Sequence, residues 1–255
     1  MTPEQAILLA IIQGITEWLP ISSSGHLLLF QNLFNIKTTL FFNLSLHLGS
    51  VLALLVVFRE DIKKLTTAFF TKNREYQKLA SLIILAIAMT SIIVFLFQKI
   101  FQKLFANMLF LGIGFLLTGI LIFLTKFVKE KKQKVNLFDA ILIGIVQGFS
   151  SLLAGFSRSG STISLALLRK INRAQAVQFS FLLLIPTIIV AFILEMYKGV
   201  EIVESPLLIL VSILITFVIS LFTLRFFLAI LKKGKFYYFA YYCLILGIIV
   251  IMLSL

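Results

Sequence analysis

The fold is decided by ISSSGHLLLF, residues 21–30, which begins four residues after Glu17 of GITEWLP, residues 14–20. Three serines, a glycine and a histidine interrupt a chain that is otherwise strongly apolar. Within a hydrocarbon core, non-helical backbone is tolerated only where protein buries it or where it lines a water-filled cavity. The stretch therefore predicts a polar turn inside a membrane protein.

The composition supports this interpretation. The chain has 255 residues, of which 60% are hydrophobic, and its mean hydropathy is +1.10, whereas soluble domains are roughly 45–50% apolar. Apolar stretches of about 20 residues recur, and each is long enough to cross a hydrocarbon core. They are continuous rather than alternating, which disfavours a β-barrel. We expect an all-α polytopic membrane protein in which residues 1–255 form a single membrane domain.

The apolar stretches predict six transmembrane helices and two interrupted regions. The expected spans are Leu40–Phe58, Leu79–Phe97, Phe105–Thr125, Ala176–Tyr197, Pro206–Leu231 and Phe236–Leu253. Regions 1–34 and 137–168 are apolar at both ends and polar in the middle. Each is expected to be a re-entrant helical hairpin, which enters and leaves the membrane on one side.

The two hairpins resemble each other in sequence. The first contains IIQGITEWLPISSSGHL and the second contains GIVQGFSSLLAGFSRSGSTIS, and the pairs QG and SG recur 134 and 135 residues apart. Each hairpin precedes three spans, and because three is odd, the second copy must be inserted upside down. The sequence therefore predicts an inverted 3+3 repeat, residues 1–125 and 137–255, with a site where the hairpins meet near the midplane.

Loop charges predict the orientation. The net charge is +13, and 17 Lys and Arg residues fall in the loops 59–78, 126–136, 169–175 and 232–235, against 4 on the other side. The positive-inside rule places the first group in the cytoplasm, where it also attracts anionic lipid, so the charge does not indicate nucleic-acid binding. Both termini and the first hairpin, with its site, are then expected at the outer face.

Two charged residues lie near the hairpin turns. Arg158 belongs to GFSRSGST, where an unpaired charge costs about 2.5–3.5 kcal/mol and a carboxylate or a phosphate is the matching partner. Glu17 could hold a divalent cation or act as a base. Alternatively, Glu17 and Arg158 could form a structural ion pair with each other. The neighbours of Arg158 supply hydroxyls and backbone N–H groups for an anion cradle: Gly155, Ser157, Ser159, Gly160, Ser161 and Thr162.

The first turn carries further candidates. Gln13 shares a helix face with Glu17 at i, i+4 spacing. SSSG at 22–25 would be an ordinary helix cap if it were isolated, but SRSG repeats it in the second hairpin. His26 is a candidate base or nucleophile, with a structural role as the alternative. The residues together indicate a polar pocket, reached from the outer face, for an anionic lipid head group, of which phosphate is the simplest.

Other polar residues in apolar surroundings are expected to be structural. His47, in LHLGS, has no carboxylate or anion-site motif beside it in sequence, as His26 has, and is expected to pack. Asp139 begins the second hairpin and is expected to cap a helix. Glu204 lies near an outer helix end and is expected to be solvated, and Arg225 is expected to reach the cytoplasmic surface.

The motifs resemble those of a known family. QGITEWLPISSSGH resembles the (E/Q)GxTExLPxSSxGH stretch of the undecaprenyl-pyrophosphate phosphatase family, the bacitracin-resistance integral membrane phosphatases, and GFSRSGSTIS resembles its second motif, PGxSRSxxT. FSFLLLIP at 179–186 agrees as well, and the resemblance covers essentially the whole chain. Ala154 stands where the family has proline and Gln178 where glutamate is expected.

The resemblance implies an enzyme of the bacterial plasma membrane. It would hydrolyse undecaprenyl diphosphate to undecaprenyl phosphate and inorganic phosphate, which recycles the lipid carrier for peptidoglycan and cell-wall synthesis and confers bacitracin resistance. It would depend on a divalent cation, Mg²⁺ or Ca²⁺, with Glu17 as a ligand. Its partners would be the polyprenyl diphosphate and membrane lipids, and a homodimer is left open.

The resemblance also assigns roles to individual residues. The catalytic residues would be Glu17, Ser23, His26 and Arg158. The substrate-binding residues would be Gln13, Ser22, Ser24, Gly25, Ser157, Ser159, Gly160 and Thr162. The nucleophile is left open between Ser23 activated by His26, His26 itself and a water activated by His26 or Glu17.

Two other functions fit the same sequence. A polyprenyl-phosphate transporter, or flippase, would use the same inverted repeat and midplane hairpins. A phosphatase for another lipid diphosphate would use the same head-group pocket, because little in the sequence measures tail length.

Overall fold

The protein is all-helical. The computed structural model describes residues 1–105, 107–129, 131, 134–197, 199 and 203–255, and no strand occurs among them. The described helices are α1 (Pro3–Thr16), α2 (Ser23–Leu33), α3 (Leu40–Val57), α4 (Arg59–Thr67), α5 (Arg74–Phe105), α6 (Met108–Leu124), η1 (Thr125–Phe127), α7 (Leu137–Leu152), α8 (Arg158–Leu168), α9 (Arg173–Tyr197), α10 (Pro206–Lys232) and α11 (Tyr238–Ser254).

Five helices in the described residues are long and apolar enough to cross a membrane. They are α3, α5, α6 with η1, α9 and α10, and they correspond to five of the six predicted spans. The sixth predicted span, Phe236–Leu253, is the apolar helix α11, which has 17 residues. An all-helical membrane protein is therefore confirmed.

Both interrupted regions are pairs of short helices joined by a turn, as predicted. The first pair is α1 and α2, and the second is α7 and α8. Each second helix starts at a serine N-cap, because its hydroxyl oxygen accepts a hydrogen bond from a backbone N–H that would otherwise lack a partner. Ser22 accepts from Gly25 N at 3.2 Å, and Ser157 accepts from Gly160 N at 3.0 Å.

The first helix of each pair is held in the same way. α1 packs along α10, and α7 packs along α5. The hydroxyl of Thr216 in α10 donates to Ala10 O at 3.1 Å, and that of Thr90 in α5 donates to Gly144 O at 2.9 Å. Ala10 and Gly144 are 134 residues apart, the separation of the two QG pairs. The two halves of the chain therefore use matching contacts.

The turn of the second hairpin is clamped by α6. Thr118 donates its hydroxyl to Gly155 O at 2.9 Å and accepts from Ser157 N at 2.8 Å. Gly155 has a φ of +83°, and a Cβ there would lie 2.2 Å from Leu111 O. Only glycine fits this position, because a side chain would meet both a steric clash and an unfavourable backbone conformation.

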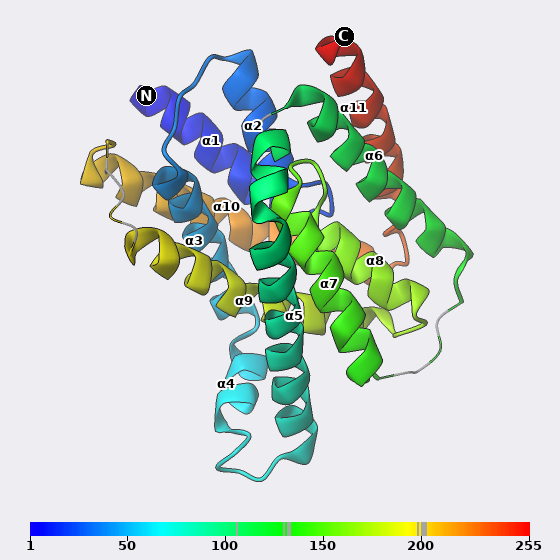
Figure 1. Cartoon of the computed structure of the whole chain (residues 1–255). Coiled ribbons are helices and arrows are strands. Elements are labelled where there is room, and N and C mark those ends of the chain that lie inside the picture. The colour runs from blue at the N-terminus through cyan, green and yellow to red at the C-terminus, as the bar shows by residue number, and fades with distance from the viewer. Residues whose placement is uncertain (106, 130, 132–133, 198, 200–202) are drawn as a thin grey trace.

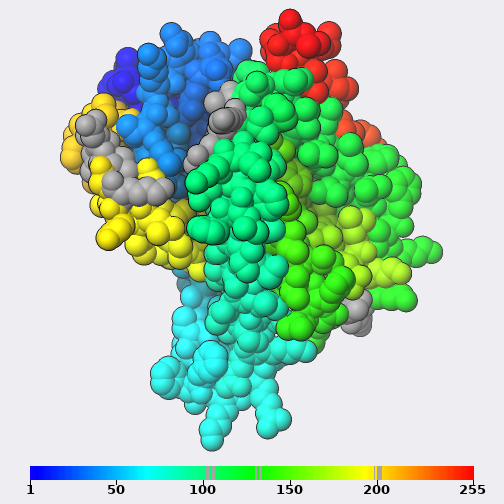
Figure 2. Space-filling view, in the orientation of Figure 1, coloured from blue at the N-terminus to red at the C-terminus, as the bar shows by residue number. Residues whose placement is uncertain are grey.

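Both chain termini lie at one end of the molecule, and α4 lies at the opposite end (Figure 1). The cyan segment that contains α4 and the start of α5 projects from the body (Figure 2). Helix α4 corrects the sequence analysis, which treated 59–78 as a loop, and α5 continues through 98–104, which was also treated as a loop. In α4, Asp61 accepts hydrogen bonds from Tyr76 of α5 at 2.8 Å and Gln178 of α9 at 2.5 Å.

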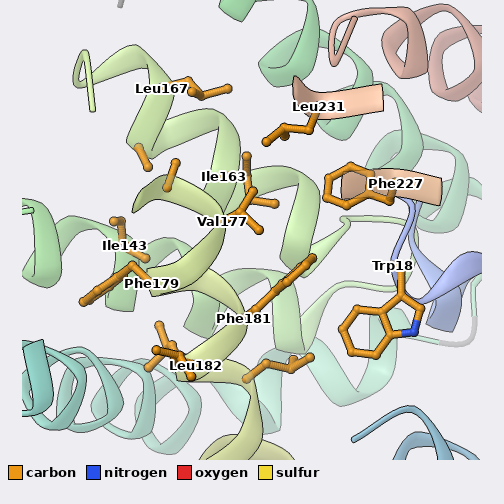
Figure 3. Packing of buried hydrophobic residues seen from close by; sticks show 14 of the residues in the cluster. Trp18, Ile143, Ile163, Leu167, Val177, Phe179, Phe181, Leu182, Phe227 and Leu231 are labelled. Carbon is orange, nitrogen blue, oxygen red and sulfur yellow. The ribbon is translucent and has the colours of Figure 1, made fainter. Parts of the chain in front are cut away.

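Aromatic packing anchors the first turn. Trp18, the residue after Glu17, is fully buried and lies edge-on to Phe181 of α9, with ring centroids 5.3 Å apart. Phe181 in turn packs on Phe227 of α10 at 5.9 Å, and these three rings lie together in the core (Figure 3). The backbone at Glu17 is therefore held by a large buried side chain.

Two structural predictions have opposite outcomes. Asp139 caps α7 as predicted, in a capping box with Asn136, and it also accepts from Arg169 Nε at 2.7 Å. Glu204 is not solvated: it is buried and accepts from the Thr39 hydroxyl at 2.9 Å. That contact joins residues 165 positions apart, so the sequence pattern could not indicate it.

Candidate active site

The two hairpin charges form an ion pair. Arg158, the first residue of α8, donates from Nη2 to Glu17 Oε1 at 2.8 Å. The side chain of Glu17 is 3% exposed and that of Arg158 is 21% exposed. Because neither charge is stable alone in an apolar interior, the pair joins the two hairpins at one point.

The second oxygen of Glu17 contacts side chains from three elements. Ser23 of α2 donates its hydroxyl to Oε2 at 2.5 Å, and Gln13 of α1 donates from Nε2 at 2.8 Å. His47 of α3 places Nδ1 3.0 Å from the same oxygen. The carboxylate is thus oriented by its neighbours and lies directly against a serine hydroxyl.

A cavity of about 700 Å³ opens beside this cluster. Its polar wall includes the first residues of α2 and α8, so the N-termini of two helices lie at it. It is lined on that side by Glu17, Ser22, Ser23, Ser24, His47, Ser157, Arg158 and Ser159. Helix N-termini together with an arginine favour an anion.

The rest of the lining is mixed. It includes apolar side chains from α3, α5 and α9 that are also exposed on the surface of the molecule, among them Leu40, Phe95, Val190 and Leu194. A side chain that is both cavity lining and surface lies at an opening. The cavity therefore connects the buried polar wall around Glu17 and Arg158 with an exposed apolar surface of the molecule.

The structure brings together most of the predicted site residues but not all. Seven line the cavity: Glu17, Ser22, Ser23, Ser24, Ser157, Arg158 and Ser159. Gln13 is buried behind Glu17 and reaches it by a hydrogen bond. Three others are buried behind the turns: Gly25, Gly160 and Thr162. Gly25 lies against Gly155, and Gly160 lies against Pro20 O. The hydroxyl of Thr162 donates to Arg158 O at 2.8 Å. These three support the site rather than line it.

His26 lies away from the cavity wall. Its Nδ1 is 2.8 Å from Ser22 O, and because a carbonyl only accepts, Nδ1 carries the proton. Its Nε2 then accepts from the Tyr242 hydroxyl at 2.7 Å. With both nitrogens occupied and its ring stacked on Tyr242, His26 joins α2 to α11 in this conformation.

His47 is the site residue that the sequence analysis missed. It was expected to pack, whereas it contacts Glu17 and lines the cavity. A signal was available, because Asn43 and His47 lie at i, i+4 on an otherwise apolar span and both line the cavity. Polar residues on one face of a membrane helix are functional candidates by default.

The residues fit a divalent cation only together with a substrate. Among the described residues, no three His, Cys, Asp or Glu side chains cluster, so the protein offers the single carboxylate of Glu17. Mg²⁺ in phosphate sites is commonly held by one or two carboxylates plus phosphate oxygens. Glu17 and the neighbouring serine hydroxyls are oxygen donors of the right kind, and a diphosphate would supply the remainder.

The arrangement has the parts of a phosphoryl-transfer site. A serine hydroxyl lies against a carboxylate, and a guanidinium lies on the other carboxylate oxygen. The hydroxyl can serve as nucleophile, the carboxylate as base, and the guanidinium as the group that stabilises negative charge on phosphate oxygens.

Comparisons with known proteins agree with this geometry. The family described as bacitracin resistance protein BacA matches residues 6–249. A protein of Carboxydothermus hydrogenoformans described as undecaprenyl-diphosphatase is 37% identical, over 100% of this chain and 98% of its own length. Proteins with the same description from Halothermothrix orenii and Korarchaeum cryptofilum are 39% and 34% identical, over 98% of this chain and 97% and 98% of their own lengths. Both the family match and these relatives extend over nearly the whole chain, and the chain belongs to the bacitracin resistance protein BacA family.

Proposed function

We propose that this chain is a membrane phosphatase that hydrolyses undecaprenyl diphosphate to undecaprenyl phosphate and inorganic phosphate, and so recycles the lipid carrier for cell-wall synthesis. The observation that carries the proposal is the Glu17 carboxylate, which holds Arg158 on one oxygen and the Ser23 hydroxyl on the other. The relatives named above are described as undecaprenyl-diphosphatases. The proposed nucleophile and the proposed charge-stabilising group therefore both contact the proposed base.

The cavity suits a lipid with a charged head. Arg158 has five N–H donors, and Glu17 accepts from Nη2, so the guanidinium can bind phosphate oxygens while it stays attached to the carboxylate. The N-termini of α2 and α8 add backbone donors. The apolar lining from α5 and α9 leads to the surface, so the long isoprenoid chain can remain in the membrane while its head group is bound.

Attack by Ser23 on the terminal phosphorus starts the reaction. The Oγ–H bond breaks, its proton passes to Glu17 Oε2, and the oxygen lone pair forms the bond to phosphorus. The bond between that phosphorus and the bridging oxygen breaks, and its electron pair stays on the departing undecaprenyl phosphate. Arg158 stabilises the negative charge on the transferring group. The 2.5 Å contact between Ser23 and Glu17 supports Glu17, rather than His26, as the base.

Water completes the cycle. It attacks the phosphorus of the phosphoserine, and the bond between phosphorus and Ser23 Oγ breaks. Ser23 Oγ takes back the proton that Glu17 holds, and both protons of the water stay on the inorganic phosphate, one of them on a former phosphoryl oxygen. Glu17 thus acts as a base in the first half and as an acid in the second.

A divalent cation, Mg²⁺ or Ca²⁺, would bind with the substrate. Glu17 would be its protein carboxylate and the diphosphate would supply further oxygens. When bound, the cation neutralises diphosphate charge and adds to the stabilisation given by Arg158.

We infer a topology of six spans and two re-entrant hairpins in an inverted repeat, with the site open to the outer face of the plasma membrane. Matching contacts of α1 with α10 and of α7 with α5 support the repeat. The chain ends lie opposite α4 (Figure 1), whose loop carries the largest group of Lys and Arg. By the positive-inside rule, this distribution supports termini on the outer side.

Phosphate release tests the function. Purified protein in detergent should release inorganic phosphate from undecaprenyl diphosphate, and Glu17→Gln should lower kcat by about 10²–10⁴-fold, the usual contribution of a general base. Glutamine keeps the size of glutamate and removes its charge. Wild-type protein that moves lipid across vesicles but releases no phosphate would favour a transporter instead.

A further inference from the structure

His47 lies within the polar cluster, although the reaction described above gives it no role. It belongs to α3, its side chain is 15% exposed, and its Nδ1 lies 3.0 Å from Glu17 Oε2. The same nitrogen lies 2.8 Å from Gln13 Nε2. The ring also lines the cavity, so it is part of the site and not of the apolar core.

The partners of His47 determine which atoms carry protons. The carboxylate of Glu17, paired with Arg158, can only accept hydrogen bonds, so a hydrogen bond from His47 to Glu17 requires the form of the ring in which Nδ1 carries a proton. Gln13 Nε2 donates to the same oxygen at 2.8 Å. The His47 and Gln13 nitrogens are also within hydrogen-bond distance of each other, and the direction of that bond depends on the His47 tautomer; with Nδ1 protonated, both nitrogens face Glu17 Oε2.

We propose that His47 is a positioning residue of the active site, which holds Glu17 Oε2 in place against the hydroxyl of Ser23. The inference rests on the proposed phosphatase function. Arg158 fixes only Oε1, and a carboxylate held at one oxygen can still rotate about its terminal bond. Ser23 moves away from Glu17 when it attacks, so it cannot be the lasting second anchor.

A donor from α3 can hold Glu17 Oε2 throughout the reaction, including when Ser23 moves away. α3 packs against α1, α9 and α10, so its position relative to Glu17 is supported by three other helices. Gln13 gives a second donor from α1. His26 cannot serve in the same way, since its two nitrogens are taken up by Ser22 and Tyr242.

Isosteric variants separate positioning from simple packing. Asparagine places its amide nitrogen near the position of Nδ1, whereas glutamine places it near that of Nε2. His47→Asn should therefore keep the donor to Glu17, and His47→Gln and His47→Ala should lose it. Ser45→Ala is the matched control, because Ser45 is a buried residue of the same helix that bonds only to its own backbone turn, at Phe41 O.

The experiment measures kcat and KM for phosphate release from undecaprenyl diphosphate by full-length variants in detergent. We expect His47→Ala and His47→Gln to lower kcat by about 10²-fold, the cost of misplacing a catalytic group by about 1 Å, with KM nearly unchanged. His47→Asn should stay near the wild type, as should Ser45→Ala.

Three outcomes would overturn the proposal. Wild-type kcat in His47→Ala would show that Glu17 needs no support from α3. Equal loss in His47→Asn and His47→Ala, with both proteins folded by thermal unfolding, would show that the Nδ1 contact is not what matters. Absence of phosphate release by the wild type would refute the phosphatase function itself, and the role of His47 with it.

Discussion

Replacement of Arg158 by alanine perturbs both stability and activity. The guanidinium is the group that neutralises Glu17 Oε1, and the carboxylate left behind is 3% exposed. Removing one partner of a buried ion pair costs about 3–5 kcal/mol, because a charge stays uncompensated. Ser23, Gln13 and His47 still hold Oε2, so we expect a loss at the lower end, about 3 kcal/mol.

The effect on activity should be larger. Arginine that stabilises a transferring phosphoryl group contributes about 10³–10⁵-fold to the rate, so Arg158→Ala should lower kcat by at least about 10³-fold. The assay is phosphate release from undecaprenyl diphosphate, with thermal unfolding in the same detergent. Arg225→Ala, at an exposed position of α10, is the matched control. It should change neither kcat for phosphate release nor the thermal stability.

A double variant tests the physical reason. If the cost comes from an uncompensated carboxylate, Arg158→Ala combined with Glu17→Gln should be more stable than Arg158→Ala alone. Additive losses of stability would contradict the ion-pair argument. Phosphate release at the wild-type rate by Arg158→Ala would remove the basis of the proposed mechanism.

Three further predictions concern the turn, the nucleophile and the topology. Gly155→Ala should destabilise the protein by at least about 1–3 kcal/mol, since a Cβ would lie 2.2 Å from Leu111 O; wild-type thermal stability would contradict the clamp by α6. Ser23→Ala should abolish the phosphoenzyme in rapid-quench trapping with radiolabelled substrate, and a phosphoenzyme that persists would assign the nucleophile elsewhere. A cysteine at Lys72, in the loop between α4 and α5, should react with an impermeant thiol reagent only from the cytoplasm, and labelling in intact cells would reverse the orientation.

The sequence was most informative where it departed from its own apolar pattern. Small polar residues between apolar runs predicted both hairpins, and the second was placed at 137–168, the limits of α7 and α8. Two opposite charges at hairpin turns predicted the pair of Glu17 and Arg158. In each case a polar group in an apolar surrounding needs a partner, and few partners are available.

The sequence was least informative where tertiary contacts decide. His47 and Glu17 are 30 residues apart. The spacing of Asn43 and His47 marks a polar face of α3, but it does not tell which helix that face meets. The position of His26 against Tyr242, 216 residues away, is likewise set by packing of α11. The polar helix α4 was missed because its charged residues gave only a loop signal, although nine consecutive residues form it.

The central claim is that the site cleaves the bond between the terminal phosphorus and the bridging oxygen of a lipid diphosphate. Phosphorus NMR of undecaprenyl diphosphate mixed with the purified protein tests it most directly, because each phosphorus of substrate and products gives its own signal. We predict that the diphosphate signals are replaced by those of undecaprenyl phosphate and inorganic phosphate in equal amounts. Diphosphate that stays intact, or that is released whole as inorganic diphosphate, would contradict the account.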